Sequence, residues 1–160
     1  MVSKIFIALV LFVSFLSADM FERGGKSFGA SLGAGSSFGQ TYTVLGVNAN
    51  YFLVDNLSVG VGYRGWFGAS PEQHEATLES NYYVPLSTKF YPYLGAFVRE
   101  TFVNSNYIDD YETYGAKAGV AMILAKNTFL SFGYVVEYFS DCQVGECSSS
   151  YPELVFGLAF

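Results

Sequence analysis

The sequence predicts an all-β fold, and three observations lead to this prediction. Large apolar residues recur at every second position over long segments, which is the period of a strand with one apolar face. Short and long turn-like segments alternate between these strands. Glycines and the few charged residues gather on the face opposite the bulky apolar side chains. Together these observations predict an eight-stranded antiparallel up-and-down transmembrane β-barrel.

The strands are bounded by residues that favour turns. Tight turns are expected around Asp55–Asn56, Ser87–Thr88 and Lys126–Asn127, and the segments GSSFGQT, GASPEQHEA, VNSNYIDDYE and SDCQVGECSSS are expected to form longer loops. In a meander this puts the short turns and both termini at one end of the barrel and the long loops at the other. The expected strands are Lys26–Ser36, Thr41–Leu53, Leu57–Phe67, Thr77–Leu86, Phe90–Phe102, Glu112–Leu124, Phe129–Phe139 and Tyr151–Phe160.

The sizes of the side chains indicate which face is inside. In the seventh strand Phe132, Tyr134 and Tyr138 share one face, and Gly133 and Glu137 share the other. The face with small residues is the one that fits inside a narrow cylinder, so the bulky face is expected to meet hydrocarbon. A soluble eight-stranded barrel or sandwich is the alternative, but its apolar face would have to be the inside.

Charged residues follow the same division. Each of the last six strands carries one charged residue whose phase places it on the small face, and lipid would exclude such residues. We expect these side chains to pair inside the barrel, because buried charges require partners. The alternative is that Arg64 and Arg99, near strand ends, are solvated at the loop side. The expected interior network comprises Arg64, Glu79, Arg99, Lys117, Glu137 and Glu153.

The first residues are expected to be a secretory signal peptide. Lys4 supplies a positive charge, Ile5–Leu16 an apolar stretch too short to span a bilayer, and Ala18 a small residue before a cleavage site. An uncleaved anchor helix is the alternative reading. The expected organisation is a signal peptide at 1–18, a short segment at 19–25 and the barrel at 26–160.

Cysteine usage and net charge narrow the function classes. Cys142 and Cys147 are the only two cysteines, and in an exported chain such a pair is expected to form a disulfide within the last loop. Neither their spacing nor their neighbours predict a metal site, and no cofactor is expected. The net charge of −6 excludes nucleic acid as a partner, because nucleic-acid-binding proteins carry basic patches.

Three segments resemble a known group of proteins. The C-terminal LVFGLAF, the hairpin NYFLVDNLSVGVGY and the segment YPYLGAF are similar to those of the small eight-stranded outer-membrane proteins of Gram-negative bacteria, of the OmpA and OmpX type. The resemblance implies an outer-membrane location, contact with lipid and lipopolysaccharide, and insertion by the barrel assembly machinery. It also implies that Leu154, Phe156, Leu158 and Phe160 form the assembly signal.

Catalytic residues are not expected. His74 is the only histidine and is expected in a polar loop, where the nearest serine is Ser70 and no histidine–nucleophile pairing is present. Asp109, Asp110 and Glu112 could together ligate a divalent cation, but a solvated loop is the expected state. We therefore expect a non-enzymatic, surface-presenting barrel that acts in adhesion or envelope interaction through a host or surface ligand. A narrow, porin-like pore for small solutes is the alternative, and a lipid A-modifying enzyme is a further one.

Overall fold

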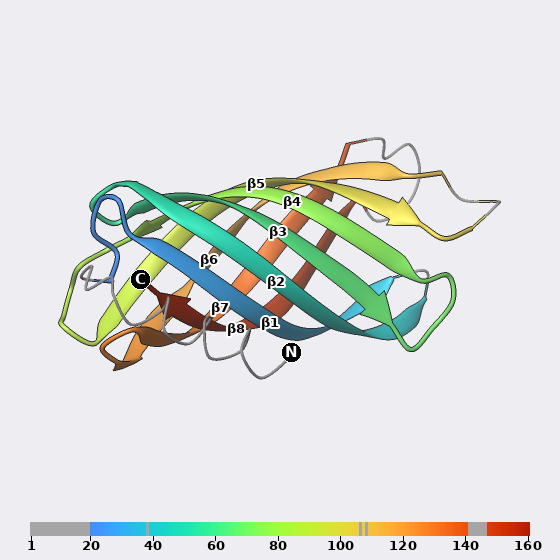
Figure 1. Cartoon of the computed structure of the whole chain (residues 1–160). Helices are drawn as coiled ribbons and strands as arrows, with labels where there is room; N and C mark the ends of the chain where they lie inside the picture. Colours follow the sequence, from blue (N-terminus) through green and yellow to red (C-terminus); the bar gives the residue numbers. More distant parts are fainter. Residues whose placement is uncertain (1–19, 38, 106, 108, 141–146) are drawn as a thin grey trace, which may run out of the picture.

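The computed structural model describes residues 20–160 apart from 38, 106, 108 and 141–146. Each strand pairs antiparallel with its sequence neighbours, and the last strand pairs with the first, so the sheet closes into a barrel (Figure 1). The predicted up-and-down barrel of eight strands is confirmed. No helix among the described residues is long and apolar enough to cross a membrane. The strands are β1 (Lys26–Ser37), β2 (Gln40–Val54), β3 (Leu57–Phe67), β4 (Gln73–Tyr83), β5 (Phe90–Val103), β6 (Tyr111–Ala125), β7 (Thr128–Phe139) and β8 (Ser148–Ala159).

The two ends of the barrel carry different connections. We call the end with the connections 55–56, 84–89 and 126–127 the turn end, and the end with the connections 38–39, 68–72, 104–110 and 140–147 the loop end. The described part of the chain begins and ends at the turn end, where Lys26 and Phe160 exchange two backbone hydrogen bonds of 2.8 Å each. This pair closes the β1–β8 seam at the terminus of the chain.

Two predicted connections were wrong. The first loop was expected to be long, but Ser37 pairs directly with Gln40, so the hairpin ladder runs through the polar residues on both sides. The connection 84–89 is longer than a tight turn, so short and long connections do not alternate strictly. Hydrogen bonds between neighbouring backbones extend these strands whatever the polarity of their side chains.

The fourth strand was also misplaced. It spans Gln73–Tyr83 rather than Thr77–Leu86, so residues 73–76 belong to a strand and not to a loop. Its inward side chains include Glu75, Thr77 and Glu79, which are all buried. The barrel interior is polar, so the residues of this strand that face it are polar too. Their composition therefore resembles that of a loop in the sequence.

Large apolar side chains form the outer surface of the barrel. Leu94, Phe132 and Val61 are 64%, 62% and 59% exposed, and every strand contributes comparable residues to this surface. The bulky face is therefore the outside, as the alternation predicts. An apolar outside and a charged inside are the arrangement of a barrel that lies in lipid.

Aromatic rings fill much of the interior by lying on glycines. Trp66 lies over Gly35, Phe97 over Gly115, Tyr93 over Gly119 and Gly133, and Phe129 over Gly157, where an added Cβ would overlap the ring. The small face of the strands thus makes room for rings that come from the next strand or from the strand after it. This packing narrows the cylinder on both sides of its charged centre.

The turn end is stoppered by Phe21, which precedes β1. Its ring is 2% exposed and stacks on Tyr83 with a centroid distance of 4.3 Å, and it also contacts Phe52, Tyr91 and Phe129. The amide of Asn56 donates a 2.7 Å hydrogen bond to the Phe21 carbonyl, which fixes the segment to the β2–β3 turn. Buried Tyr42, Val44 and Trp66 form a second apolar cluster towards the loop end.

Candidate functional site

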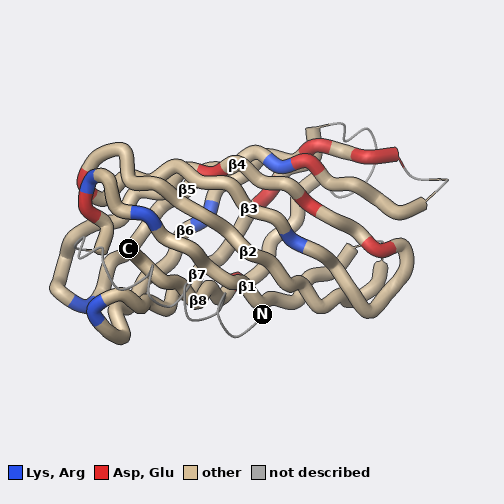
Figure 2. The backbone as a smooth tube through the Cα atoms, in the orientation of Figure 1, with Lys and Arg blue, Asp and Glu red and all other residues tan. Residues whose placement is uncertain are grey.

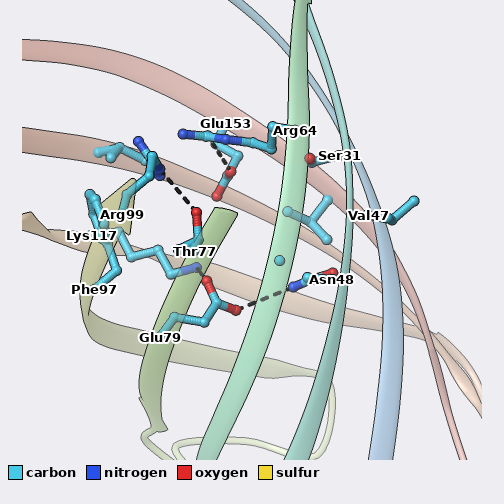
Figure 3. Close-up of a pocket in the computed structure, with 13 residues that line it drawn as sticks. Ser31, Val47, Asn48, Arg64, Thr77, Glu79, Phe97, Arg99, Lys117 and Glu153 are labelled. Atoms are coloured by element: carbon cyan, nitrogen blue, oxygen red, sulfur yellow. Dashed lines mark hydrogen bonds and ion pairs between the residues drawn. The ribbon is translucent and has the colours of Figure 1, made fainter. Parts of the chain in front are cut away.

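The centre of the barrel holds an ion cluster around two arginines. Arg64 of β3 donates from Nε to Glu75 Oε2 at 2.8 Å and from Nη1 to Glu153 Oε1 at 3.2 Å. Arg99 of β5 pairs with Glu137 and lies 3.4 Å from the same Glu75 oxygen. Two guanidinium groups thus form ion pairs with the carboxylates of Glu75, Glu137 and Glu153, and Glu75 contacts both arginines. Figure 3 shows Arg64, Arg99 and Glu153.

Tyr151 of β8 joins the two arginines from the opposite wall. Its hydroxyl oxygen accepts hydrogen bonds from Arg64 Nη2 at 2.7 Å and Arg99 Nη1 at 2.9 Å. The guanidinium of Arg64 also lies over the Tyr151 ring, and that of Arg99 lies 4.5 Å from the centroid of Phe97. These contacts satisfy donors of two buried arginines.

A second ion pair lies nearer the turn end. Lys117 Nζ donates to Glu79 Oε2 at 2.6 Å, and the amide nitrogens of Asn48 and Asn81 donate to Glu79 Oε1 at 3.3 and 3.2 Å (Figure 3 shows the Lys117, Glu79 and Asn48 contacts). Glu79 therefore has a partner on each carboxylate oxygen. Such a fully hydrogen-bonded pair is what a buried carboxylate requires.

All six charged residues expected inside are placed there, and each has an ionic partner. Sequence reasoning missed Glu75, because β4 was misplaced and this residue was assigned to a loop. The alternation of polar residues at Glu75, Thr77 and Glu79 could have identified it as an inward residue of a strand. Sequence reasoning also missed the hydroxyl group of Tyr151. The solvated alternative for Arg64 and Arg99 is wrong, since each is 6% exposed.

Little free volume remains between these side chains. One cavity of about 30 Å³ lies between the two ion groups. Another of about 20 Å³ lies on the turn-end side of the Lys117–Glu79 pair. Each has room for one or two water molecules. Together with the aromatic clusters towards both ends, the ion pairs fill much of the described interior.

His74 lies on the outer wall of β4 and not in a loop, which corrects its predicted placement. Its ring stacks on Tyr63 at a centroid distance of 6.0 Å and meets Phe67 edge-on at 6.3 Å. Its Nδ1 has no hydrogen-bond partner among the described residues. The imidazole is therefore packed between aromatic rings, and the described residues hold no nucleophile bonded to it.

The remaining predicted sites are placed only in part. Cys142 lies outside the described residues, so its disulfide with Cys147 stays a prediction. No group of three or more histidine, cysteine or acidic residues in the described part of the chain could hold a metal ion. The predicted signal peptide, residues 1–18, lies wholly outside the described residues, which begin at Met20.

Three residues of the predicted assembly signal, Leu154, Phe156 and Leu158, lie along the outer side of β8, and the fourth, Phe160, directly follows the strand. Leu154, Phe156 and Leu158 are 39%, 48% and 38% exposed, and Phe160 forms the closing pair with Lys26. Their side chains alternate with inward Val155 and Ala159. This arrangement leaves the apolar side chains of the strand accessible from the lipid side.

A closed eight-stranded barrel with a charged interior and an apolar belt defines the class of small outer-membrane β-barrels. The structure is similar to the N-terminal β-barrel domain of Pseudomonas aeruginosa OprF, with a TM-score of 0.66 and 17% identity, covering 86% of this chain and 98% of that one. It is also similar to Neisserial surface protein A, with a TM-score of 0.61 and 20% identity, covering 84% and 94%. The resemblance to small outer-membrane barrels is thus confirmed for the fold, and an outer-membrane location agrees with the apolar belt.

The same fold occurs in an enzyme. The structure matches the outer membrane enzyme PagL with a TM-score of 0.53 and 12% identity, covering 82% of this chain and 98% of that one. No family model and no curated protein matches the sequence. The fold therefore defines the architecture of the chain but not its activity, which has to be argued from its own residues.

Proposed function

We propose that this chain is an integral outer-membrane barrel that presents its loop end as a binding surface and has no enzymatic activity. The filled interior is the observation that carries the proposal: ion pairs occupy the centre, and the Phe21 and Trp66 clusters close the two ends. With its interior filled, the barrel serves as an anchor, and binding falls to the surface outside the membrane.

The chemistry of the loop end supports a basic partner. Its exposed charged residues are all acidic among the described residues, and exposed Tyr107 lies between them in the sequence. The turn end carries exposed residues of both signs, its cations lying beside the acidic Glu22 and Asp55, and Figure 2 shows both colours there. The acidic residues are Glu72, Glu100, Asp109, Asp110 and Glu112, and the cations at the turn end are Arg23, Lys26, Lys89 and Lys126.

An acidic surface with aromatic side chains attracts a positively charged protein by Coulomb forces and by cation–π contacts. We therefore propose that the surface ligand, on a host cell or in the envelope, presents lysines or arginines. Lipopolysaccharide is expected beside the barrel, where divalent cations would have to bridge its phosphates to these carboxylates.

The proposal can be tested with purified protein in nanodiscs and a fluorescent lysine-rich peptide as the probe. Asp109→Asn combined with Asp110→Asn should weaken binding, and added salt should weaken it further. The matched control is Glu22→Gln combined with Asp55→Asn, which removes the same charge from the turn end and should leave binding unchanged. Equal binding by all variants would contradict the proposal.

A narrow pore is the second candidate, because the two polar cavities and the ion cluster follow one another inside the barrel. Conductance of the pure protein in planar bilayers separates the candidates. The surface-presenting role predicts a quiet bilayer, whereas discrete openings would favour the pore. Acyl-chain release from lipid A by the pure protein would instead favour an enzyme.

A further inference from the structure

The outer wall of the barrel is hollowed near the turn end. A groove of about 470 Å³ crosses β1, β2 and β3 there and reaches β4. The hollow follows from the small size of Ala49, because its neighbours across the sheet, Phe28 and Val61, are both larger. Sites that hold small molecules have volumes of about 300–1,000 Å³, so the groove is large enough for a ligand.

The lining of this groove is apolar along most of its length. Ser27 and Asn50 also border it, but both side chains are buried on the inner face of the wall. No acidic side chain among the described residues lines the groove. The residues that give it its apolar and aromatic surface are Phe28, Ala49, Tyr51, Val59, Val61, Leu78 and Phe160.

Lys26 lies at the turn-end rim of the groove. Its backbone is fixed by the two hydrogen bonds to Phe160 and by its pairing with Tyr51 in the sheet. The side chain is exposed, and its ammonium group has no ion-pair partner in the described part of the chain. An unpaired cation thus stands beside an apolar groove, which is the arrangement that suits a ligand with an anionic head and a hydrocarbon tail.

The depth of the groove in the membrane agrees with such a ligand. Short turns of outer-membrane barrels face the periplasm, and aromatic residues such as Tyr51 and Phe160 mark the level of the lipid headgroups. Lys26, the first residue of β1, is at this level. The groove extends from there to Leu78, in the middle of β4, and therefore into the hydrocarbon of the bilayer.

We propose that this groove holds one anionic glycerophospholipid, whose acyl chain lies over Ala49 and whose phosphate binds the ammonium group of Lys26. A lysine near the membrane surface attracts anionic lipids more strongly than lipids without net charge. A second copy of the chain fits less well, because a two-fold interface over the groove would bring two Lys26 side chains together with no acidic side chain in the groove to offset them. This lipid site goes beyond the proposed role of the loop end.

The experiment uses purified protein in micelles that contain equal amounts of phosphatidylglycerol and phosphatidylcholine with the same acyl chains. Native mass spectrometry should show one retained lipid, with about a five-fold excess of phosphatidylglycerol. Lys26→Gln should abolish this preference. The matched control Lys126→Gln removes a cation from the β6–β7 turn and should keep it. Glycerol 3-phosphate, which has the anionic group without acyl chains, should not displace the lipid.

A second pair of variants tests the groove itself. Ala49→Phe fills the hollow and should remove the retained lipid although Lys26 is intact. The matched control Ala118→Phe makes the same exchange on the outer face of β6 and should retain the lipid. Because one molecule uses both parts of the site, adding Lys26→Gln to Ala49→Phe should cause no further loss.

The lipid preference is measured on the unaltered protein, so the proposal stays testable if a variant does not fold. Equal retention of phosphatidylglycerol and phosphatidylcholine would overturn it, and so would a dimer that carries no lipid. Retention that depends on Lys26 and Lys126 alike would also overturn it, because the turn end would then attract lipids through its overall charge. None of these outcomes depends on what the loop end binds.

Discussion

Arg64 and Glu153 are 89 positions apart in the chain, and their side chains pair inside the barrel with an Nη1–Oε1 distance of 3.2 Å. They come from β3 and β8, which are not neighbours in the sheet. The contact therefore crosses the interior, and it exists only when the barrel is closed. It ties the interior network to the strand that completes the barrel.

Replacing an interior arginine should lower the free energy of unfolding more than replacing Lys117. Arg99→Met leaves Glu137 without its ionic partner and removes bonds to Thr77 and Tyr151. We expect a loss of about 3 kcal/mol or more in the free energy of unfolding. Urea unfolding from lipid vesicles, followed by tryptophan fluorescence, would measure it.

Lys117→Met is the comparison for this prediction, since Glu79 keeps its hydrogen bonds from Asn48 and Asn81. Its cost should be smaller. Equal costs for both variants would mean that the amide hydrogen bonds do not support Glu79.

Removing the stopper ring should destabilise the barrel. Phe21→Ala leaves a cavity between Phe52, Tyr83, Tyr91 and Phe129. Removing a buried ring of this kind should lower the free energy of unfolding by about 3 kcal/mol. The control is Phe28→Ala, the same exchange on the outer face, where lipid can fill the space. A similar cost for both variants, in the same unfolding measurement, would argue against a packed stopper.

The lipid-facing surface can be tested at Phe132, which is 62% exposed near the middle of β7. Phe132→Arg should reduce the free energy of folding into bilayers by about 2–4 kcal/mol, because hydrocarbon excludes the charge. Phe132→Leu should change it little. Folding yields in vesicles, read from the gel mobility of unboiled samples, would distinguish them. Tolerance of arginine would mean that this face does not meet lipid.

Glycines of the inner face should differ sharply in their tolerance of a methyl group. An added Cβ at Gly119 would overlap the Phe132 carbonyl oxygen and lie 2.7 Å from Gly133 Cα, whereas at Gly62 the nearest atom is 3.5 Å away. Gly119→Ala should cost about 1–3 kcal/mol, and Gly62→Ala should be nearly neutral. Urea midpoints of the two variants would decide, and an equal effect would contradict the close packing over Gly119.

The terminal phenylalanine can be tested without loss of backbone pairing. Phe160→Ala keeps both hydrogen bonds to Lys26 and removes only the ring. If the ring is part of the assembly signal, barrel insertion in cells should fall while detergent refolding stays unchanged. The amount of unboiled, compact protein in membrane fractions measures the first, and refolding of the purified variant measures the second.

How much of this could be predicted from the sequence differs between the fold and the site. The alternation in β7 and β8 assigns inside and outside correctly, because side chains of a strand point to opposite faces whatever the strand pairs with. The six inward charges follow from the same rule. Glu75 was missed because polar residues in a strand that faces a polar interior have the composition of a loop.

The sequence by itself determined the number of strands, their faces and the apolar belt, since these depend on local period and side-chain size. The tertiary structure alone decided which charges meet, that Phe21 closes the turn end, and that aromatic rings lie on glycines such as Gly133 and Gly157. The physical reason is that such contacts depend on the register and closure of the sheet, which place residues from distant strands on opposite walls of one cylinder.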